Sequence, residues 1–187
     1  MNAASYSIGR ADAGLIVIDM QEKLAAAMKP GIIELAVKNT GILIQTVKLF
    51  GMPIIVSEQY RKGLGVTVGP LAELLAGIEP LEKLCFDCVR DDALARAIAG
   101  AGKNTFVMAG IEAHVCVFQT ALSLLRKGYR VVVASDAVAS RRKHDWKYAL
   151  RALAGAGALV YPTETIAFML LEKAGTGEFK KLSPLFK

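Results

Sequence analysis

Gly14-Leu-Ile-Val-Ile-Asp19 is the stretch that decides the fold of this 187-residue chain, because five residues without a polar side chain run directly into a carboxylate. Such a run is typical of a strand that is buried on both faces of a parallel sheet. Similar runs recur at residues 53–57, 104–109 and 130–134, with a weaker one at 158–161. The sequence therefore predicts several strands of one buried sheet.

Helical patterns fill the gaps between these apolar runs. They cover residues 30–50, 91–101, 115–127, 144–154 and 163–172. Strands that alternate with helices pair in parallel through right-handed crossovers and carry helices on both faces. We therefore expect an α/β fold, a three-layer α/β/α sandwich around a mostly parallel, doubly wound sheet. At this length the chain is expected to form a single domain over residues 1–187.

The composition is that of an ordered globular protein. Hydrophobic residues make up 53% of the chain and charged residues 21%. This apolar excess predicts a homo-oligomer, either a dimer or a larger assembly. The beginning of the sequence lacks the basic and apolar segments of a secretion signal, and no apolar run approaches the ~18 residues of a membrane span. A cytoplasmic protein without a membrane partner is expected.

The net charge of +6 is spread unevenly, with −2 over residues 1–94 and +8 over residues 95–187. The densest basic cluster is Arg141-Arg142-Lys143. A nucleic-acid-binding protein would have a basic face with interleaved aromatic residues or a recognisable module, and neither is evident in this sequence. The cluster is interpreted as a solvated face, with attraction of anions as the alternative. No nucleic-acid partner is expected.

Three cysteines without a secretion signal predict free thiols instead of disulfides. Cys85 and Cys88 form a Cys-x-x-Cys pair, which could be a redox motif or half of a zinc site. No second pair exists, and only His114 and His144 could complete a metal site. The pair is interpreted as structural, with a thiol oxidoreductase as the alternative. No metal or cofactor is expected.

Cys116 follows the strand pattern at residues 104–109 and lies at the start of the helical pattern at 115–127. The backbone N–H groups at a helix N-terminus stabilise a thiolate and could hold an oxyanion. The alternative is a small buried hydrophobic residue. In the common doubly wound order, the strand before Cys116 neighbours the one that Asp19 ends, at the switch point where ligands bind. A thiol and a carboxylate are thus expected in one crevice.

Asp19 and Lys83 each have two interpretations. Asp19 could be a helix N-cap, or the base that removes the Cys116 proton and later activates water. Lys83 could lie on the surface, although it stands in the short apolar stretch 80–87, where a lysine seldom occurs without a counter-charge. Beside Asp19 and Cys116, its ammonium group would favour the thiolate and keep the carboxylate ionised.

Five motifs follow one another along nearly the whole chain. They are Leu15-Ile-Val-Ile-Asp-Met-Gln21, Ser57-Glu-Gln-Tyr60 with Gly63-Leu-Gly65, Glu82-Lys83 before Cys85-Phe86, Gly110-Ile-Glu-Ala-His-Val-Cys116, and Ser135-Asp-Ala137 with Ser140-Arg141. In this order they resemble the isochorismatase-like cysteine hydrolases, and most closely the branch called isochorismatase domain-containing proteins. The resemblance implies a six-stranded sheet in an isochorismatase-like, Rossmann-like fold.

The resemblance also implies roles for particular residues. It implies a catalytic triad of Asp19, Lys83 and Cys116. It implies a cis peptide bond between Ile111 and Glu112, which would direct the backbone N–H groups of Glu112 and Cys116 into an oxyanion hole. In the implied mechanism Cys116 attacks a carbonyl carbon, an amine or ammonia leaves, and water activated by Asp19 hydrolyses the thioester.

Departures from the family pattern narrow the implied chemistry. Nicotinamidases of this superfamily carry an Asp-x-His metal motif after the second strand, where this chain has Glu58-Gln59-Tyr60. Isochorismatases proper do not need the cysteine, so Cys116 favours hydrolysis of an amide or related C–N bond in a small molecule. The alternative is a binding or scaffold protein of the same fold that has lost turnover.

The substrate pocket is the part of the site that the sequence constrains least. Its candidate lining residues are Gln21, Tyr60, Phe86, His114 and Trp146. Aromatic residues near strand ends are more often part of the core. His114 stands two residues before Cys116, and this spacing points the two side chains apart, so packing or substrate contact is favoured over a Cys–His dyad.

Overall fold

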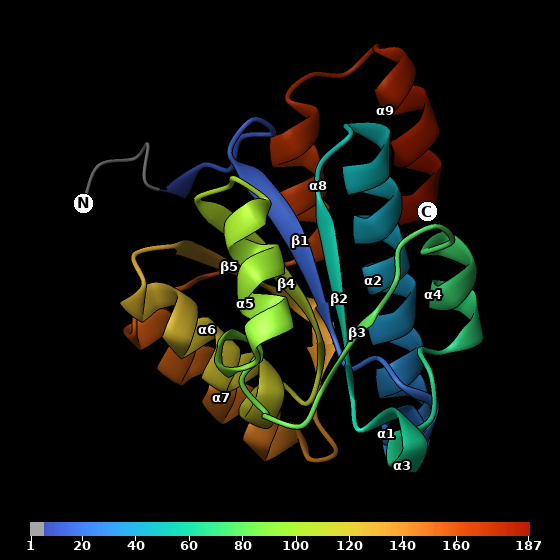
Figure 1. Ribbon diagram of the computed structural model, residues 1–187. Helices are drawn as coiled ribbons and strands as arrows, with labels where there is room; N and C mark the ends of the chain where they lie inside the picture. Colours follow the sequence, from blue (N-terminus) through green and yellow to red (C-terminus); the bar gives the residue numbers. More distant parts are fainter. Residues whose placement is uncertain (1–5) are drawn as a thin grey trace.

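Six strands form one parallel sheet in the computed structural model, which describes residues 6–187 (Figure 1). They are β1 (Ala13–Ile18), β2 (Ile54–Gln59), β3 (Leu81–Lys83), β4 (Thr105–Ile111), β5 (Arg130–Ala139) and β6 (Leu159–Tyr161). Their order is β3–β2–β1–β4–β5–β6, and every pair is parallel. The predicted doubly wound sandwich is confirmed, with β1 and β4 adjacent where the strand order reverses.

Helices cover both faces of the sheet (Figure 1). One face carries α2 (Pro30–Leu49), α4 (Gly69–Leu74) and α8 (Thr163–Leu171), and the other carries α5 (Asp92–Gly100), α6 (Phe118–Arg126) and α7 (Lys143–Gly155). The shorter helical segments are α1 (Glu22–Ala26), α3 (Arg61–Leu64), η2 (Cys88–Arg90), η3 (Ala113–Val117), α9 (Gly177–Leu182) and η4 (Ser183–Phe186). Within residues 6–187, no helix is long and apolar enough to cross a membrane.

Successive residues of the central strands face opposite layers. Leu15 and Val17 pack in the cluster that includes α2 and α8, whereas Ile16 and Ile18 pack in the cluster that includes α5, α6 and α7. All four are fully buried. Because both faces of β1 are covered, the strand contains no polar side chain before Asp19.

The helix predicted over residues 115–127 needs a correction at its start. The chain first makes the π-helical turn η3 and becomes α-helical only at Phe118. Within this turn the Val117 N–H donates to the Glu112 carbonyl, five residues back, at 3.3 Å. A π-helical turn is wider than an α-helical one and is frequent at functional sites. Cys116 therefore lies in this wider turn and not in the first turn of an α-helix.

The strand predicted over residues 130–134 continues to Ala139 through a bulge at residues 134–137, where the pairing with β4 shifts register. Side chains from helices on both faces hold this bulge. Asn39 of α2 donates to the Asp136 carbonyl at 3.0 Å, and Trp146 of α7 donates to the Ser135 carbonyl at 3.1 Å. The apolar pattern stops at the bulge because its residues no longer alternate between two covered faces.

Strands β1 and β4 approach each other closely at Gly110. This residue has φ of +131°, and a Cβ atom there would overlap the carbonyl oxygen of Ile18 and lie 2.7 Å from its backbone nitrogen. Only glycine allows this approach, because any side chain would push the two strands apart.

We expect Gly110→Ala to lower the free energy of unfolding by more than about 4 kcal/mol, because the new methyl group overlaps the backbone of β1. Gly128→Ala is the matched control, since Gly128 has φ of +84° but nothing within 4 Å of the added Cβ. It should cost about 1 to 2 kcal/mol. Urea unfolding measures both variants, and equal costs would contradict the close approach.

Candidate active site

Asp19, Lys83 and Cys116 lie where strands end at one edge of the sheet. Asp19 directly follows β1, Lys83 is the last residue of β3, and Cys116 lies in η3 just after β4. β2 lies between β1 and β3, so its last residues are adjacent to the ends of both strands. The carboxyl ends of parallel strands are the usual position of a ligand site in this architecture.

Asp19 and Lys83 form a buried ion pair. Lys83 Nζ donates to Asp19 Oδ2 at 2.7 Å, and both side chains are 0% exposed. Lys83 Nζ also donates to Gln59 Oε1 at 2.7 Å, and Ser57 Oγ donates to Asp19 Oδ1 at 2.7 Å. The surface interpretation of Lys83 is therefore wrong. The N-cap interpretation of Asp19 is wrong as well, because the N-cap of α1 is Gln21.

The backbone of Asp19 turns the chain out of the sheet. Its φ of +51° is uncommon outside glycine. The Asp19 N–H still donates to the Ser57 carbonyl at 3.0 Å, and its own carbonyl accepts from the Gln21 N–H at 2.7 Å. The residue is therefore held on both sides by backbone hydrogen bonds. Such conformations cluster at functional sites.

Gln21 has a positioning role that the sequence did not reveal. Its side chain is fully buried, and within residues 6–187 it forms hydrogen bonds to backbone groups. The amide nitrogen donates to the carbonyls of Gln59 and Gly65, at 3.0 and 2.6 Å, and its oxygen accepts from the Gln59 N–H at 2.7 Å. These bonds hold the end of β2 beside β1, which places Gln59 against Lys83.

The charges around Cys116 favour its protonated form. Burial raises the pKa of the Cys116 thiol, the Asp19 carboxylate raises it further, and Lys83 lowers it without outweighing burial. Burial alone would lower the pKa of Lys83, but the negative charge of Asp19 beside it favours the ammonium form, so the pKa of Lys83 is raised. The resting arrangement is thus a neutral thiol beside an ion pair.

The Cys-x-x-Cys pair has two unlike environments. Cys85 is exposed and Cys88 is buried, and both are free thiols. Cys88 Sγ lies 3.7 Å from Ser57 Oγ, behind the ion pair, and burial raises its pKa to about 11. A buried thiol with a raised pKa is a poor nucleophile, so the exposed Cys85 has no reactive partner in Cys88.

The segment between β4 and Cys116 is joined to the basic cluster. The peptide bond between Ile111 and Glu112 is cis. The Glu112 carboxylate accepts from the backbone N–H of Arg141 at 3.0 Å and from its Nε at 3.1 Å. Arg141 therefore forms a defined ion pair and is not only part of a solvated face. It ties the end of β5 to the residue after β4.

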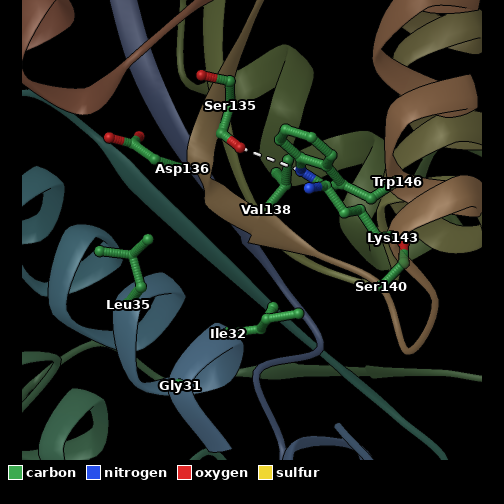
Figure 2. Close-up of a pocket in the computed structure, with 9 residues that line it drawn as sticks. All are labelled: Gly31, Ile32, Leu35, Ser135, Asp136, Val138, Ser140, Lys143 and Trp146. Carbon is green, nitrogen blue, oxygen red and sulfur yellow. Dashed lines mark hydrogen bonds between the residues drawn. The ribbon is translucent and has the colours of Figure 1, made fainter. Parts of the chain in front are cut away.

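The remaining predicted pocket residues have different environments. His114 Nδ1 lies 2.9 Å from Ser140 Oγ, and its Nε2 lies 4.0 Å from Asp145 Oδ2, so neither ring nitrogen is directed at the cysteine by these contacts. Tyr60 and Phe86 are 48% and 54% exposed, respectively, so they are not core residues. Trp146 lines a pocket to which Ser140, the partner of His114, also belongs (Figure 2).

Two residues of the site were missed by sequence reasoning. Ser57 and Gln59, which contact the two members of the ion pair, are both buried near the end of β2. The available signal was their polarity at the end of an apolar strand within a quoted motif. Their role became visible only when β3, a strand of three residues, brought Lys83 beside them.

At the position where nicotinamidases carry a metal ligand motif, this chain has Glu58, which bonds to other residues of the chain. Glu58 is buried, and its carboxylate accepts from the N–H and hydroxyl of Thr67, at 2.6 and 2.7 Å, and from Arg61. Across residues 6–187, no group of three His, Cys, Asp or Glu side chains is placed to hold a metal ion.

A six-stranded parallel α/β sandwich with a buried acid–lysine pair and a cysteine at its switch point defines the class of protein, an isochorismatase-like α/β fold. Residues 13–165 match the Isochorismatase domain, so the chain belongs to the isochorismatase family, whose members are hydrolases. Mouse isochorismatase domain-containing protein 2A is 33% identical over 193 residues, which cover 100% of this chain and 90% of that relative.

Solved structures agree with this assignment. A protein from Caenorhabditis elegans described as MAR1 ribonuclease is 33% identical, with a TM-score of 0.87 over 96% of this chain and 91% of its own. The Escherichia coli YcaC gene product, described as an octameric hydrolase of unknown specificity, has a TM-score of 0.88 over 96% of this chain and 89% of its own. It is 22% identical and shows the same fold.

Lys83→Met should lower the free energy of unfolding by about 3 to 5 kcal/mol, because it leaves the Asp19 carboxylate buried without a counter-charge. The double variant Asp19→Asn, Lys83→Met should lose less than the sum of the two single losses, since neither charge is then left alone. Chemical denaturation of the four proteins measures this, with Lys147→Met, an exposed lysine, as control. Additive losses would contradict a direct pair.

The rate at which iodoacetamide alkylates Cys116 should still rise about tenfold per pH unit above pH ~8.5, where the rate for an unperturbed cysteine becomes constant. The raised pKa keeps the thiol protonated, and only the thiolate reacts. Asp19→Asn should speed the reaction by about tenfold at a given pH, because it removes a charge that raises the pKa. Peptide mass spectrometry follows the rate, with exposed Cys85 as internal reference. A rate that becomes constant near pH ~8.5, or slower labelling in Asp19→Asn, would contradict a Cys116 pKa that is raised by Asp19.

Proposed function

We propose that this protein is a metal-independent cysteine hydrolase that cleaves an amide or related C–N bond of a small molecule through an acyl-enzyme on Cys116. The observation that carries the proposal is the fully buried Asp19–Lys83 ion pair, whose charges act on the Cys116 thiol at the switch point of the sheet. A buried pair of this kind is expensive to maintain for stability alone. Perturbed titratable groups of this kind cluster at catalytic sites.

The proposed reaction starts with the neutral thiol. Cys116 Sγ attacks the carbonyl carbon while its proton passes to Asp19, and Asp19 then gives that proton to the departing nitrogen. Asp19 next takes a proton from water, the resulting hydroxide attacks the thioester carbon, and the proton returns to the sulfur. The ammonium group of Lys83 holds the Asp19 carboxylate in position at the start of each step. The N–H groups of Glu112 and Cys116 are the proposed oxyanion donors.

Two other functions are less well supported by the contacts. An oxidoreductase built on Cys85 and Cys88 would need an accessible, acidic thiol pair, whereas Cys88 is buried and has a pKa raised to about 11. A binding protein without turnover would have the same fold, and only a reaction separates it from a hydrolase. We also propose a homo-oligomer, since the E. coli protein of the same fold is described as octameric.

The test is a pooled library of small amides, ureas and carbamates, scored for release of ammonia or amine and for a covalent adduct on Cys116. Cys116→Ala should reduce release by about a thousandfold or more, whereas Cys85→Ser, the exposed thiol, should leave it unchanged. Release that survives Cys116→Ala would contradict the nucleophile. No adduct and no release would favour the binding protein.

RNA belongs in the same assay, because the C. elegans protein is described as a ribonuclease. We expect no cleavage of RNA by the wild-type protein above that of Cys116→Ala. RNA cleavage that needs Asp19 but not Cys116, with no amide turnover, would replace the proposed reaction by another hydrolysis at the same site.

A further inference from the structure

A concave site is formed by residues of α2, β5 and α7. It has a volume of about 430 Å³ and lies between the start of α2, the bulge of β5 and the first turn of α7 (Figure 2). Neither Asp19, Lys83 nor Cys116 lines it. This volume is in the range of sites that hold one small organic molecule.

The walls of this pocket are apolar. Ile32 and Leu35 from α2, Val138 from β5 and the indole ring of Trp146 form them (Figure 2). The Trp146 Nε1–H donates to the Ser135 carbonyl at 3.1 Å, which fixes the indole against the bulge. Leu35 is 51% exposed, although it belongs to an apolar wall. An aromatic or aliphatic group of a ligand would cover these surfaces.

The pocket contains one cation that no carboxylate neutralises. The Lys143 side chain points into the pocket (Figure 2). Among the ion pairs of residues 6–187, none involves Lys143. Lys143 is also the first residue of α7, where the positive end of the helix dipole adds to its charge. The pocket therefore favours an anionic group beside its apolar walls.

Asp136 is the other charged residue of the pocket, and its carboxylate is engaged elsewhere. Asp136 Oδ1 accepts from the backbone N–H of Thr163 at 2.8 Å and from its hydroxyl at 2.7 Å, at the start of α8. In Figure 2 this carboxylate points away from Trp146. It therefore leaves the space between Trp146 and Lys143 available to an anion.

We propose that this pocket binds a small apolar molecule that carries a single carboxylate, with its ring or chain against Trp146 and its carboxylate on Lys143. Ser140 also lines the pocket, and its hydroxyl can bond a second carboxylate oxygen when it is not engaged by His114. The binding site goes beyond the proposed hydrolysis and does not depend on turnover at Cys116.

Tryptophan fluorescence tests the proposal directly, because Trp146 is the only tryptophan in the chain. Titration with phenylacetate should change its emission in a saturable manner, and 2-phenylethanol, an uncharged analogue, should bind at least about tenfold more weakly. Lys143→Gln should remove this preference. Lys147→Gln, which removes an exposed cation one turn further along α7, should retain it.

A second variant tests the position of the ligand without altering the core. Leu35→Asp places a negative charge at the exposed apolar wall and should weaken phenylacetate binding by about tenfold or more. Leu84→Asp, at an exposed leucine that does not line the pocket, is the control. Equal affinity for the two ligands, or no effect of Lys143→Gln, would overturn the proposal. So would emission that depends on protein concentration and on neither ligand, because a second copy would then fill the pocket.

Discussion

The ammonium group of Lys83 and the carboxylate of Asp19 lie where water does not reach, so each requires the other. An unpaired buried charge costs several kcal/mol, and even a pair must have its remaining hydrogen-bonding groups satisfied. Ser57 and Gln59 supply those bonds from the end of β2. The need to pair these charges therefore constrains the register of three strands, because the ends of β1, β2 and β3 must lie side by side for the four side chains to be in contact.

The same ion pair sets the chemical character of Cys116. A lysine alone would favour the thiolate, but burial and the Asp19 carboxylate keep the thiol protonated. At rest the site therefore holds a protonated thiol and a carboxylate that acts on it. Such an arrangement suits acyl transfer, in which one carboxylate moves a proton from the nucleophile to the leaving group. Membership of a hydrolase family agrees with this chemistry.

Much of the fold could be predicted because both faces of the sheet are covered. β1 and β4 are continuous apolar runs for that reason, and their alternation with helices implied parallel pairing. β3 could not be recognised, since its three residues carry no periodicity. The π-helical turn before α6 was missed as well, because an apolar helical pattern does not distinguish a wide turn from an α-helical one. The bulge of β5 lies where its pattern ends.

By itself, the sequence determined the layered fold, because the burial pattern is a local property. It also identified Asp19, Lys83 and Cys116 as candidate reactive side chains, because residue type is a local property as well. Only the tertiary structure decided what those groups do to one another. Whether Lys83 is a surface lysine or the partner of Asp19 depends on a pairing between β2 and β3, which no local pattern encodes. The charge state of Cys116 likewise depends on burial and on the distance to other charges, and both exist only once the strands are in register.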